Sequence, residues 1–359
     1  MINWGILGTG MIARALAVSM QDSTGSQLKA VASRSIEKAE KFGEKYDCSA
    51  VEGYENLLND SEIDAIYVAT PHDSHFDLTL AALKAKKSVL CEKPMTLNST
   101  ETMVLIEAAR ENEVLLMEAF MYRTHPQTDK IRELVKEEFK DNPITIEASF
   151  GFSAQVPEEH RLVNPELGGG SIMDIGCYPM SMSRMIIGEQ NGKPFSNPVV
   201  IEAKGELSSR GVDLNATAKL SFDNGSKALI SSAINKPLKN SVLIANEEKS
   251  IYVAEPWQCG EQNNRQSQII YKRKGREDEV IDFKEEKGVF TYEIDHFVSL
   301  LNQEKKQSEK ISHADSHGNM VWLDAWRKEI GVYYSADNPE NRKFSLLGEA
   351  AIKDREPIS

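Results

Sequence analysis

The sequence predicts an α/β protein in two parts: an N-terminal domain with a doubly wound parallel sheet, and a C-terminal α+β domain with a large, mostly antiparallel open sheet. In the first part, short apolar runs alternate with helical patterns, which is typical of parallel strands joined by crossover helices. In the second part, strand-like runs follow one another, which favours antiparallel pairing. The length of 359 residues fits two domains, because one domain usually takes about 100–200 residues.

The N-terminal domain is predicted to span residues 1–123. Its expected strands are residues 2–7, 28–32, 63–69, 88–91 and 114–117. Its expected helices are residues 11–21, 36–46, 74–86 and 99–110. Asn98, followed three residues later by Glu101, favours a helix start with a carboxylate near the helix N-terminus.

The second domain is predicted to span residues 124–335. Its expected strands are residues 144–152, 199–207, 212–222, 226–234, 241–245, 250–253 and 267–272. The helices expected to cover this sheet are residues 128–139, 171–187, 289–303 and 317–333. The C-terminal tail, residues 336–359, is polar and contains proline, and receives no assignment.

Composition restricts the function. The net charge is 42 − 55 = −13, which disfavours a general role on nucleic acid or anionic membranes, although a local basic pocket remains open. The four cysteines are scattered without metal-ligand spacing, which argues against a zinc site and a disulfide scaffold. No apolar run is long enough to cross a bilayer, and the N-terminus lacks a signal-peptide pattern. We therefore expect a cytoplasmic protein without a metal ion and without a membrane partner.

A glycine-rich turn follows the first expected strand. It reads Gly8-Thr9-Gly10-Met11-Ile12-Ala13, a GxGxxA pattern that opens a helix. The first glycine allows a tight turn, the second lets backbone amides approach a pyrophosphate, and the alanine permits close helix packing. Since free N–H groups at a helix N-terminus attract anions, this turn predicts dinucleotide binding. The alternative is a tight turn without a ligand.

The end of the second expected strand bears on the type of dinucleotide. An NAD site usually has Asp or Glu there, which binds the ribose 2′-hydroxyl. This chain instead has Ser33 and Arg34, with Lys38 one turn onward. Arg34 and the hydroxyl can hydrogen-bond a 2′-phosphate, so we favour NADP. NAD remains possible because Glu37 is nearby, and Arg34 could equally be a solvated surface residue.

Two further loops lie at the carboxyl edge of the predicted sheet, where ligands of such sheets bind. One contains Glu92-Lys93-Pro94, and the proline restrains Lys93 toward extended backbone. Lys93 could polarise a substrate oxygen, whereas most lysines at strand ends point to water. The other loop runs Thr70-Pro71-His72-Asp73-Ser74-His75. No further ligand cluster supports a metal there, so His75 is expected to be a hydrogen-bonding residue.

These motifs, together with Gly168–Gly170 leading to Asp174 and Tyr178, resemble the Gfo/Idh/MocA oxidoreductases over residues 1–330. Tyr178, His72 and the Arg161-Leu162 pair are similar to one branch, which holds dimeric dihydrodiol dehydrogenases, NADP-dependent xylose dehydrogenases and glucose–fructose oxidoreductase. The resemblance implies a Rossmann domain followed by an open-sheet domain. It also implies a homodimer or homotetramer formed through that sheet.

The resemblance further implies that Lys93, Asp174 and Tyr178 surround the reacting carbon of a sugar, polyol or cyclic trans-diol. Tyr178 is the best candidate acid/base. A phenol pKa of about 10 is too high for base catalysis near neutral pH, so we expect Lys93 to lower it. Asp174, four residues before Tyr178 on the same helix face, would accept a substrate hydroxyl or orient Lys93.

Weaker candidates complete the expected site. Arg123 is a candidate for cofactor contact. The candidates for substrate contact are Arg161, His160, Phe152 and Trp257, although buried aromatics are more often core residues. Two other functions remain open: a glycosidase of the same family that oxidises its substrate transiently with bound NAD, and a cofactor-sensing regulator such as the galactose-pathway repressor. The set of Lys93, Asp174 and Tyr178 argues against a regulator, which does not need it.

Overall fold

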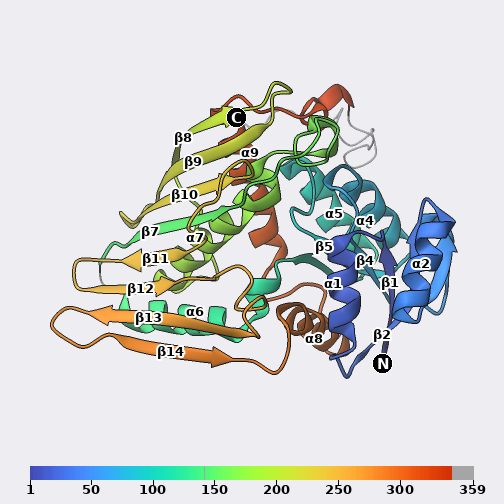
Figure 1. The fold of residues 1–359 in the computed structure, drawn as a ribbon, viewed down its shortest axis with the longest axis horizontal. Helices are drawn as coiled ribbons and strands as arrows, with labels where there is room; N and C mark the ends of the chain where they lie inside the picture. Colours follow the sequence, from blue (N-terminus) through green and yellow to red (C-terminus); the bar gives the residue numbers. More distant parts are fainter. Residues whose placement is uncertain (141, 342–359) are drawn as a thin grey trace.

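Two separate β-sheets organise the chain in the computed structural model, which describes residues 1–140 and 142–341 (Figure 1). The first sheet has the strand order β3-β2-β1-β4-β5-β6, and all of its pairs are parallel. The second has the order β14-β13-β12-β11-β7-β10-β9-β8. Only β7 and β10 pair in parallel among its described strands, and the other pairs are antiparallel. The predicted fold class is confirmed.

The first sheet and its helices follow the predicted order. The elements are β1 (Ile2–Leu7), α1 (Met11–Met20), β2 (Ser26–Ser33), α2 (Ile36–Tyr46), β3 (Ser49–Glu52), α3 (Tyr54–Leu58), β4 (Ala65–Val68), α4 (His75–Lys84), β5 (Ser88–Glu92), α5 (Ser99–Glu111) and β6 (Leu116–Ala119). The sequence did not predict β3 or α3, because each is too short for a periodic pattern. Asn98 caps α5 as expected, since its side chain accepts a hydrogen bond from the Glu101 N–H.

The second part of the chain contains the larger sheet. The elements are α6 (Pro126–Glu138), β7 (Thr145–Gly151), α7 (Cys177–Gln190), β8 (Val200–Leu207), β9 (Asp213–Ser221), β10 (Lys227–Ala233), β11 (Val242–Ala245), β12 (Lys249–Val253), β13 (Gln266–Arg273), β14 (Glu279–Lys284), α8 (Val289–Asn302) and α9 (His313–Glu329). The edge strand β14 was not predicted, because it is charged and mostly exposed. A π-helical turn, Ile172–Gly176, precedes α7 where we expected one regular helix.

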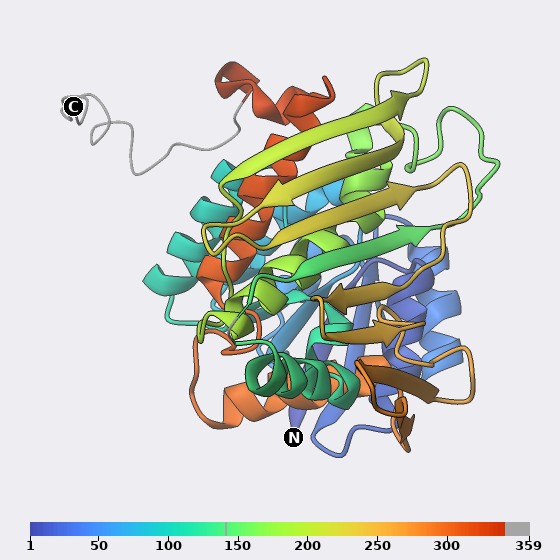
Figure 2. The same ribbon diagram turned by 90° about the vertical axis from the view of Figure 1, so that its left-hand side faces the viewer.

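Helices cover one face of the large sheet. α7 packs on β7 and β10, and α9 packs on β8 and α7. Figure 2 shows the opposite face of this sheet toward the viewer, with helices behind it. Our expectation that residues 289–303 also cover this sheet is wrong, because α8 packs beside α1 (Figure 1) and contributes Ile294 and Phe297 to the core of the first sheet.

The described end of the chain returns to the first part of the molecule. Asn98 donates a hydrogen bond to the Ala336 carbonyl, and Asp337 forms an ion pair with Arg327 of α9. The first residues of the predicted tail, 336–359, therefore contact the rest of the structure. Residues 342–359 lie outside the described part. Within the described ranges, no helix combines the length and apolar character needed to span a bilayer.

Candidate active site

A cleft of about 360 Å³ lies at the carboxyl edge of the first sheet, against the π-helical turn and the start of α7. Most of the predicted site residues line this cleft: Gly10, Met11, Ile12, Thr70, Pro71, His72, His75, Glu92, Lys93, Arg161, Asp174 and Tyr178. They come from both halves of the chain. The fold therefore brings together the motifs that the sequence analysis selected separately.

The glycine-rich turn presents an uncapped helix end to the cleft. Gly8 has a φ of 107°, and a Cβ there would lie 2.8 Å from the Ala69 carbonyl oxygen, so a side chain does not fit. Gly10 precedes α1 without a side-chain cap, and the first turn of α1 has no acidic residue. The first turn of α1 itself therefore supplies no competing carboxylate. These features fit the pyrophosphate of a dinucleotide.

The end of β2 carries the groups expected at a 2′-phosphate. Ser33 is buried. Arg34 lies just before α2 and Lys38 lies in the first turn of α2, and both are exposed. Ser35 caps α2, and its hydroxyl also donates to a Glu37 carboxylate oxygen at 2.6 Å. This hydrogen bond lowers the pKa of Glu37. Burial raises the pKa of Tyr54, and the charge of Arg34 opposes this; the sequence did not point to this neighbour, because Tyr54 follows the short unpredicted β3.

Lys93 connects the two halves of the site. Its Nζ donates a hydrogen bond to the backbone carbonyl of Asp174 at 2.6 Å, and lies 5.1 Å from the centre of the Tyr178 ring. The preceding Glu92 is buried and accepts hydrogen bonds from the Tyr67 hydroxyl and the Lys93 N–H. The ammonium is thus fixed between β5 and the π-helical turn.

Asp174 is an ionised carboxylate within the cleft. Its Oδ1 accepts a hydrogen bond from Arg161 Nη1 at 2.8 Å. Burial alone would raise its pKa, but the charges of Lys93 and Arg161 outweigh that effect and hold the pKa below its usual range. Arg161 therefore reaches the cleft from the loop before the three glycines.

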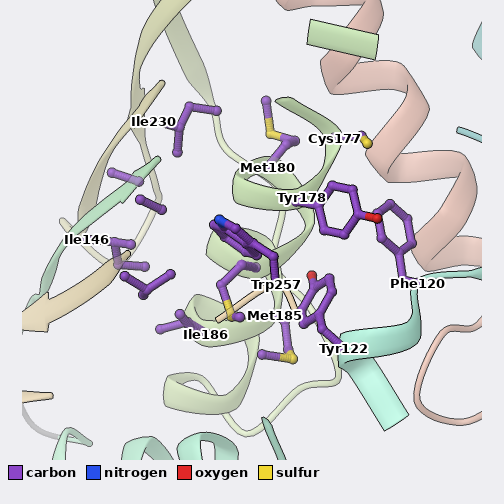
Figure 3. Packing of buried hydrophobic residues seen from close by; sticks show 14 of the residues in the cluster. Phe120, Tyr122, Ile146, Cys177, Tyr178, Met180, Met185, Ile186, Ile230 and Trp257 are labelled. Atoms are coloured by element: carbon purple, nitrogen blue, oxygen red, sulfur yellow. The ribbon is translucent and has the colours of Figure 1, made fainter. Parts of the chain in front are cut away.

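Tyr178 is packed among aromatic rings, which Figure 3 shows together with Trp257. Its ring centre lies 5.5 Å from that of Phe120 and 5.8 Å from that of Tyr122, and its hydroxyl lies 3.5 Å from Met121 Sδ. Burial raises its pKa well above 10, and the negative charge of Glu92 adds to this effect. Our expectation of a lowered pKa is therefore wrong for this structure, because burial dominates, and Lys93 Nζ lies over the ring and donates to the Asp174 carbonyl.

The two histidines serve as hydrogen-bonding residues. His72 Nδ1 lies 2.9 Å from the Gly168 carbonyl oxygen, and the ring nitrogens of His75 lie 2.8 Å and 2.9 Å from the carbonyl oxygens of Thr70 and Pro94. Burial lowers the pKa of His72 to about 3 and that of His75 to about 4. Both rings are therefore neutral near neutral pH, and since a neutral ring has one N–H group, His75 donates to only one of its two carbonyl contacts at a time.

Two predicted ligand contacts are instead core residues. Arg123 is buried in an ion pair with Asp315 at 2.8 Å and donates to Ser181, so it does not line the cleft. Trp257 is 2% exposed, and its Nε1 donates to the Ser149 carbonyl. Its ring packs against that of Tyr178 (Figure 3), and it does not line the cleft.

Two other predicted substrate contacts also lie away from the cleft. Phe152 packs into a small apolar cluster with Leu162 and Ile234. His160 is exposed, and its Nδ1 accepts a hydrogen bond from the Leu162 N–H. Phe150, two residues earlier, is the phenylalanine that lines the cleft, whereas Phe152 lies beyond the end of β7, where the alternation of strand faces no longer predicts its direction.

Several lining residues were missed: Ala69, Met121, Phe150, Ile175, Gln258 and Phe290. Ile175 could have been found from its neighbour Asp174. Gln258 and Phe290 carry no local signal, because only the folding of a distant loop and of α8 brings them to the cleft. Among the described residues, no group of three His, Cys, Asp or Glu side chains could hold a metal ion.

Comparisons with known proteins agree with this geometry. The family model described as "Oxidoreductase family, NAD-binding Rossmann fold" matches residues 2–120, and the "GFO/IDH/MocA C-terminal domain" matches residues 128–252. The trans-1,2-dihydrobenzene-1,2-diol dehydrogenase of Xenopus tropicalis is 32% identical over 92% of this chain and 98% of its own. A D-xylose 1-dehydrogenase (NADP(+)) of Haloferax volcanii is 32% identical over 65% of this chain and 70% of its own.

A solved structure shows the same fold. The 3-ketoreductase from Actinomadura kijaniata, in complex with NADP and TDP-benzene, has a TM-score of 0.81 at 24% identity, and the match covers 93% of this chain and 99% of that one. The family matches and the full-length similarity to a dehydrogenase confirm the resemblance drawn from the motifs. The chain belongs to the Gfo/Idh/MocA family of oxidoreductases and begins with its NAD-binding Rossmann domain.

Proposed function

We propose that this protein is an NADP-dependent dehydrogenase or reductase that acts on a CH–OH or carbonyl carbon of a cyclic trans-diol, sugar or polyol. The observation that carries the proposal is the convergence of Lys93, Asp174 and Tyr178 on one cleft beside the uncapped N-terminus of α1. A bound nicotinamide cofactor supplies the hydride chemistry. The side chains must then bind the substrate and move its proton.

Tyr178 is the proton donor in the reducing direction, because its buried hydroxyl stays protonated near neutral pH. Lys93 uses one N–H group on the Asp174 carbonyl, and its other N–H groups can polarise the substrate oxygen. Asp174 uses Oδ1 on Arg161, and its other carboxylate oxygen can accept a second substrate hydroxyl. A diol or sugar offers two neighbouring oxygens of this kind.

The lining of the cleft supports a ring-shaped substrate. Phe150, Ile175 and Phe290 supply apolar surface, and Gln258 adds an amide that can hydrogen-bond a hydroxyl. The names of the relatives, a dihydrodiol dehydrogenase and a xylose dehydrogenase, point to the same substrate class. Preference for NADP is supported by Arg34, directly after β2, and Lys38, in the first turn of α2. It is also supported by the NADP in the names of the xylose dehydrogenase and of the 3-ketoreductase complex.

The test is a panel of trans-diols, aldoses, polyols and 1,2-dicarbonyls, assayed with NADP and then with NAD by absorbance of the reduced cofactor. Lys93→Met and Tyr178→Phe should each abolish turnover and still bind NADPH in a fluorescence titration. Tyr122→Phe is the matched control, because Tyr122 belongs to the same ring cluster but donates its hydroxyl to Ser181 outside the cleft. Absence of net cofactor turnover with every substrate would overturn the proposal and favour the NAD-dependent glycosidase instead.

We also propose a homodimer or homotetramer formed through the open face of the large sheet, in the cytoplasm. Val200, Leu229 and Val280 are 48%, 40% and 50% exposed on strands of this sheet, and an assembly through the sheet would cover such side chains. The free cysteines fit a reducing compartment. Light scattering should give a multiple of the chain mass, and Leu229→Asp should lower it. A monomeric wild type would contradict the proposed assembly.

A further inference from the structure

The loop of three glycines is fixed at each residue by a different part of the chain. The Gly168 carbonyl oxygen lies 2.9 Å from His72 Nδ1 in the first half of the chain. The Gly169 carbonyl accepts a hydrogen bond from the Tyr334 hydroxyl at 2.5 Å, near the described end. A Cβ at Gly170 would lie 2.4 Å from Oδ1 of Asp213 on β9. The loop therefore has little freedom to move.

Asp213 fixes the two residues that follow the three glycines. It is fully buried, and its Oδ2 accepts hydrogen bonds from the Ser171 hydroxyl at 2.6 Å and the Ile172 N–H at 2.7 Å. Ile172 opens the π-helical turn, so the carboxylate satisfies a backbone donor at the N-terminus of a helical segment. Ser171 also hydrogen-bonds Ser232 of β10 at 2.9 Å. The turn is thereby attached to two strands of the large sheet.

The π-helical turn and the start of α7 carry groups of the candidate active site. Asp174 lies in the middle of the π-helical turn, and its backbone carbonyl accepts the hydrogen bond from Lys93. Tyr178 follows in the first turn of α7. A shift at Ile172 would move all three groups relative to one another. π-Helical turns often occur at functional sites, where they change the direction of side chains.

We propose that Asp213 is a positioning residue: through Ser171 and Ile172 it holds Asp174 and Tyr178 at the correct distance from Lys93. This inference rests on the proposed function, since it assigns to Asp213 a role in that same site. Asp213 does not line the cleft, so it acts only through the turn. A displacement of about 1 Å at a reacting group can lower a rate by about a hundredfold.

The test compares Asp213→Ala, which removes the acceptor, with Asp213→Asn, whose amide oxygen can still accept both hydrogen bonds. Asp213→Ala should lower kcat by about tenfold to a hundredfold, with little change in the dissociation constant of NADPH, because the cofactor-binding residues lie on the first sheet. Asp213→Asn should restore most of kcat. If Asp213 had only a structural role, Asp213→Ala would lower thermal stability without lowering kcat selectively over NADPH binding.

Ser226→Ala is the matched control. Ser226 is also buried and accepts a hydrogen bond from a backbone N–H, that of Ile144, but it bonds Gln190 at the far end of α7. This variant should lose stability and retain kcat. An equal loss of kcat in the alanine and asparagine variants of Asp213, or a loss in Ser226→Ala as large as in Asp213→Ala, would overturn the proposal.

Hydrogen exchange provides a readout that does not depend on activity. Without cofactor or substrate, peptides covering residues 168–180 should exchange faster in Asp213→Ala than in wild type, and should be unchanged in Ser226→Ala. Unchanged exchange in Asp213→Ala would also overturn the proposal. If the wild type turned over no substrate of the panel, the proposed function would fail, and this exchange experiment would still decide whether Asp213 holds the turn.

Discussion

The ionisation of Tyr178 predicts different pH dependences for the two directions of the reaction. Burial raises the pKa of its hydroxyl well above 10, while Lys93 Nζ lies over the ring and donates to the Asp174 carbonyl. Even with a pKa of about 10, only about one tyrosine in a thousand is ionised at about pH 7, and each pH unit raises that fraction tenfold. Alcohol oxidation needs the phenolate as a base, whereas carbonyl reduction needs the phenol as an acid.

We therefore expect kcat for oxidation at saturating NADP to rise about tenfold per pH unit from about pH 7 to about pH 9. Reduction should be nearly constant between about pH 6 and pH 8, since the phenol remains protonated. Three groups that line the cleft add no transition in this window: Asp174 has a lowered pKa, and burial holds the pKa of His72 at about 3 and that of His75 at about 4. Burial raises the pKa of Asp213 to about 6, so its titration belongs at the lower edge of the window.

The assay is stopped-flow measurement of the hydride-transfer step in both directions, so that product release does not conceal the chemistry. Tyr122→Phe should retain the slope, whereas Tyr178→Phe should lose it together with most of the rate. Oxidation that reaches a plateau below about pH 8, or reduction that falls between about pH 6 and pH 8, would refute the reasoning. Either result would mean that Lys93 moves beside the hydroxyl in the working complex.

Three further predictions concern the cofactor, the core and one histidine. Arg34→Ala should raise KM for NADP about tenfold and leave KM for NAD unchanged. A charge-assisted hydrogen bond contributes about 1.5–3 kcal/mol, and the low end applies because Arg34 is exposed. Lys45→Ala, at the far end of α2, is the control. Trp257→Ala should lower the free energy of unfolding in urea by about 3–5 kcal/mol, since the side chain is buried. Unchanged stability with weaker substrate binding would show that Trp257 contacts the substrate after all. His75 has a pKa lowered from 6.5 to about 4, so its neutral form contributes stability that is lost as pH falls through this range. The stability difference between wild type and His75→Gln should therefore narrow by up to about 3 kcal/mol near pH 4, and a constant difference would show that the ring titrates normally.

Local patterns predicted what depends on local chemistry. Gly8 and Gly10 could be interpreted because a βα turn needs small residues wherever it occurs, and Asn98 because a helix start needs an acceptor. The elements that were missed, β3 and α3, have four and five residues and carry no periodicity. α8 was predicted as a helix but assigned to the wrong sheet, because a periodic apolar face does not specify which core it will join.

The site residues divide in the same way: those in local motifs could be predicted, and those that depend on distant contacts could not. Lys93, Asp174 and Tyr178 stand in motifs, so their meeting in one cleft could be expected from the resemblance. Arg123 was misassigned because its partner Asp315 is far away in the sequence, and only the fold shows that the pair is buried. Asp213 was missed for a similar reason: its carboxylate gains a role only when β9 approaches the loop of three glycines.

The three glycines themselves show why flexibility is the wrong explanation for their presence. A Cβ at Gly168 would lie 2.4 Å from a Leu97 methyl group, and a Cβ at Gly169 would lie 2.6 Å from the Arg161 carbonyl oxygen. Each glycine therefore permits a close approach, and each approach ends in a hydrogen bond or a packed contact. Glycine costs more conformational entropy to order than any other residue, so its use in a fixed loop requires compensating contacts. Those contacts come from the first sheet, the large sheet and the residues after α9, and this explains how two sheets without a shared strand hold Lys93 and Tyr178 in one site.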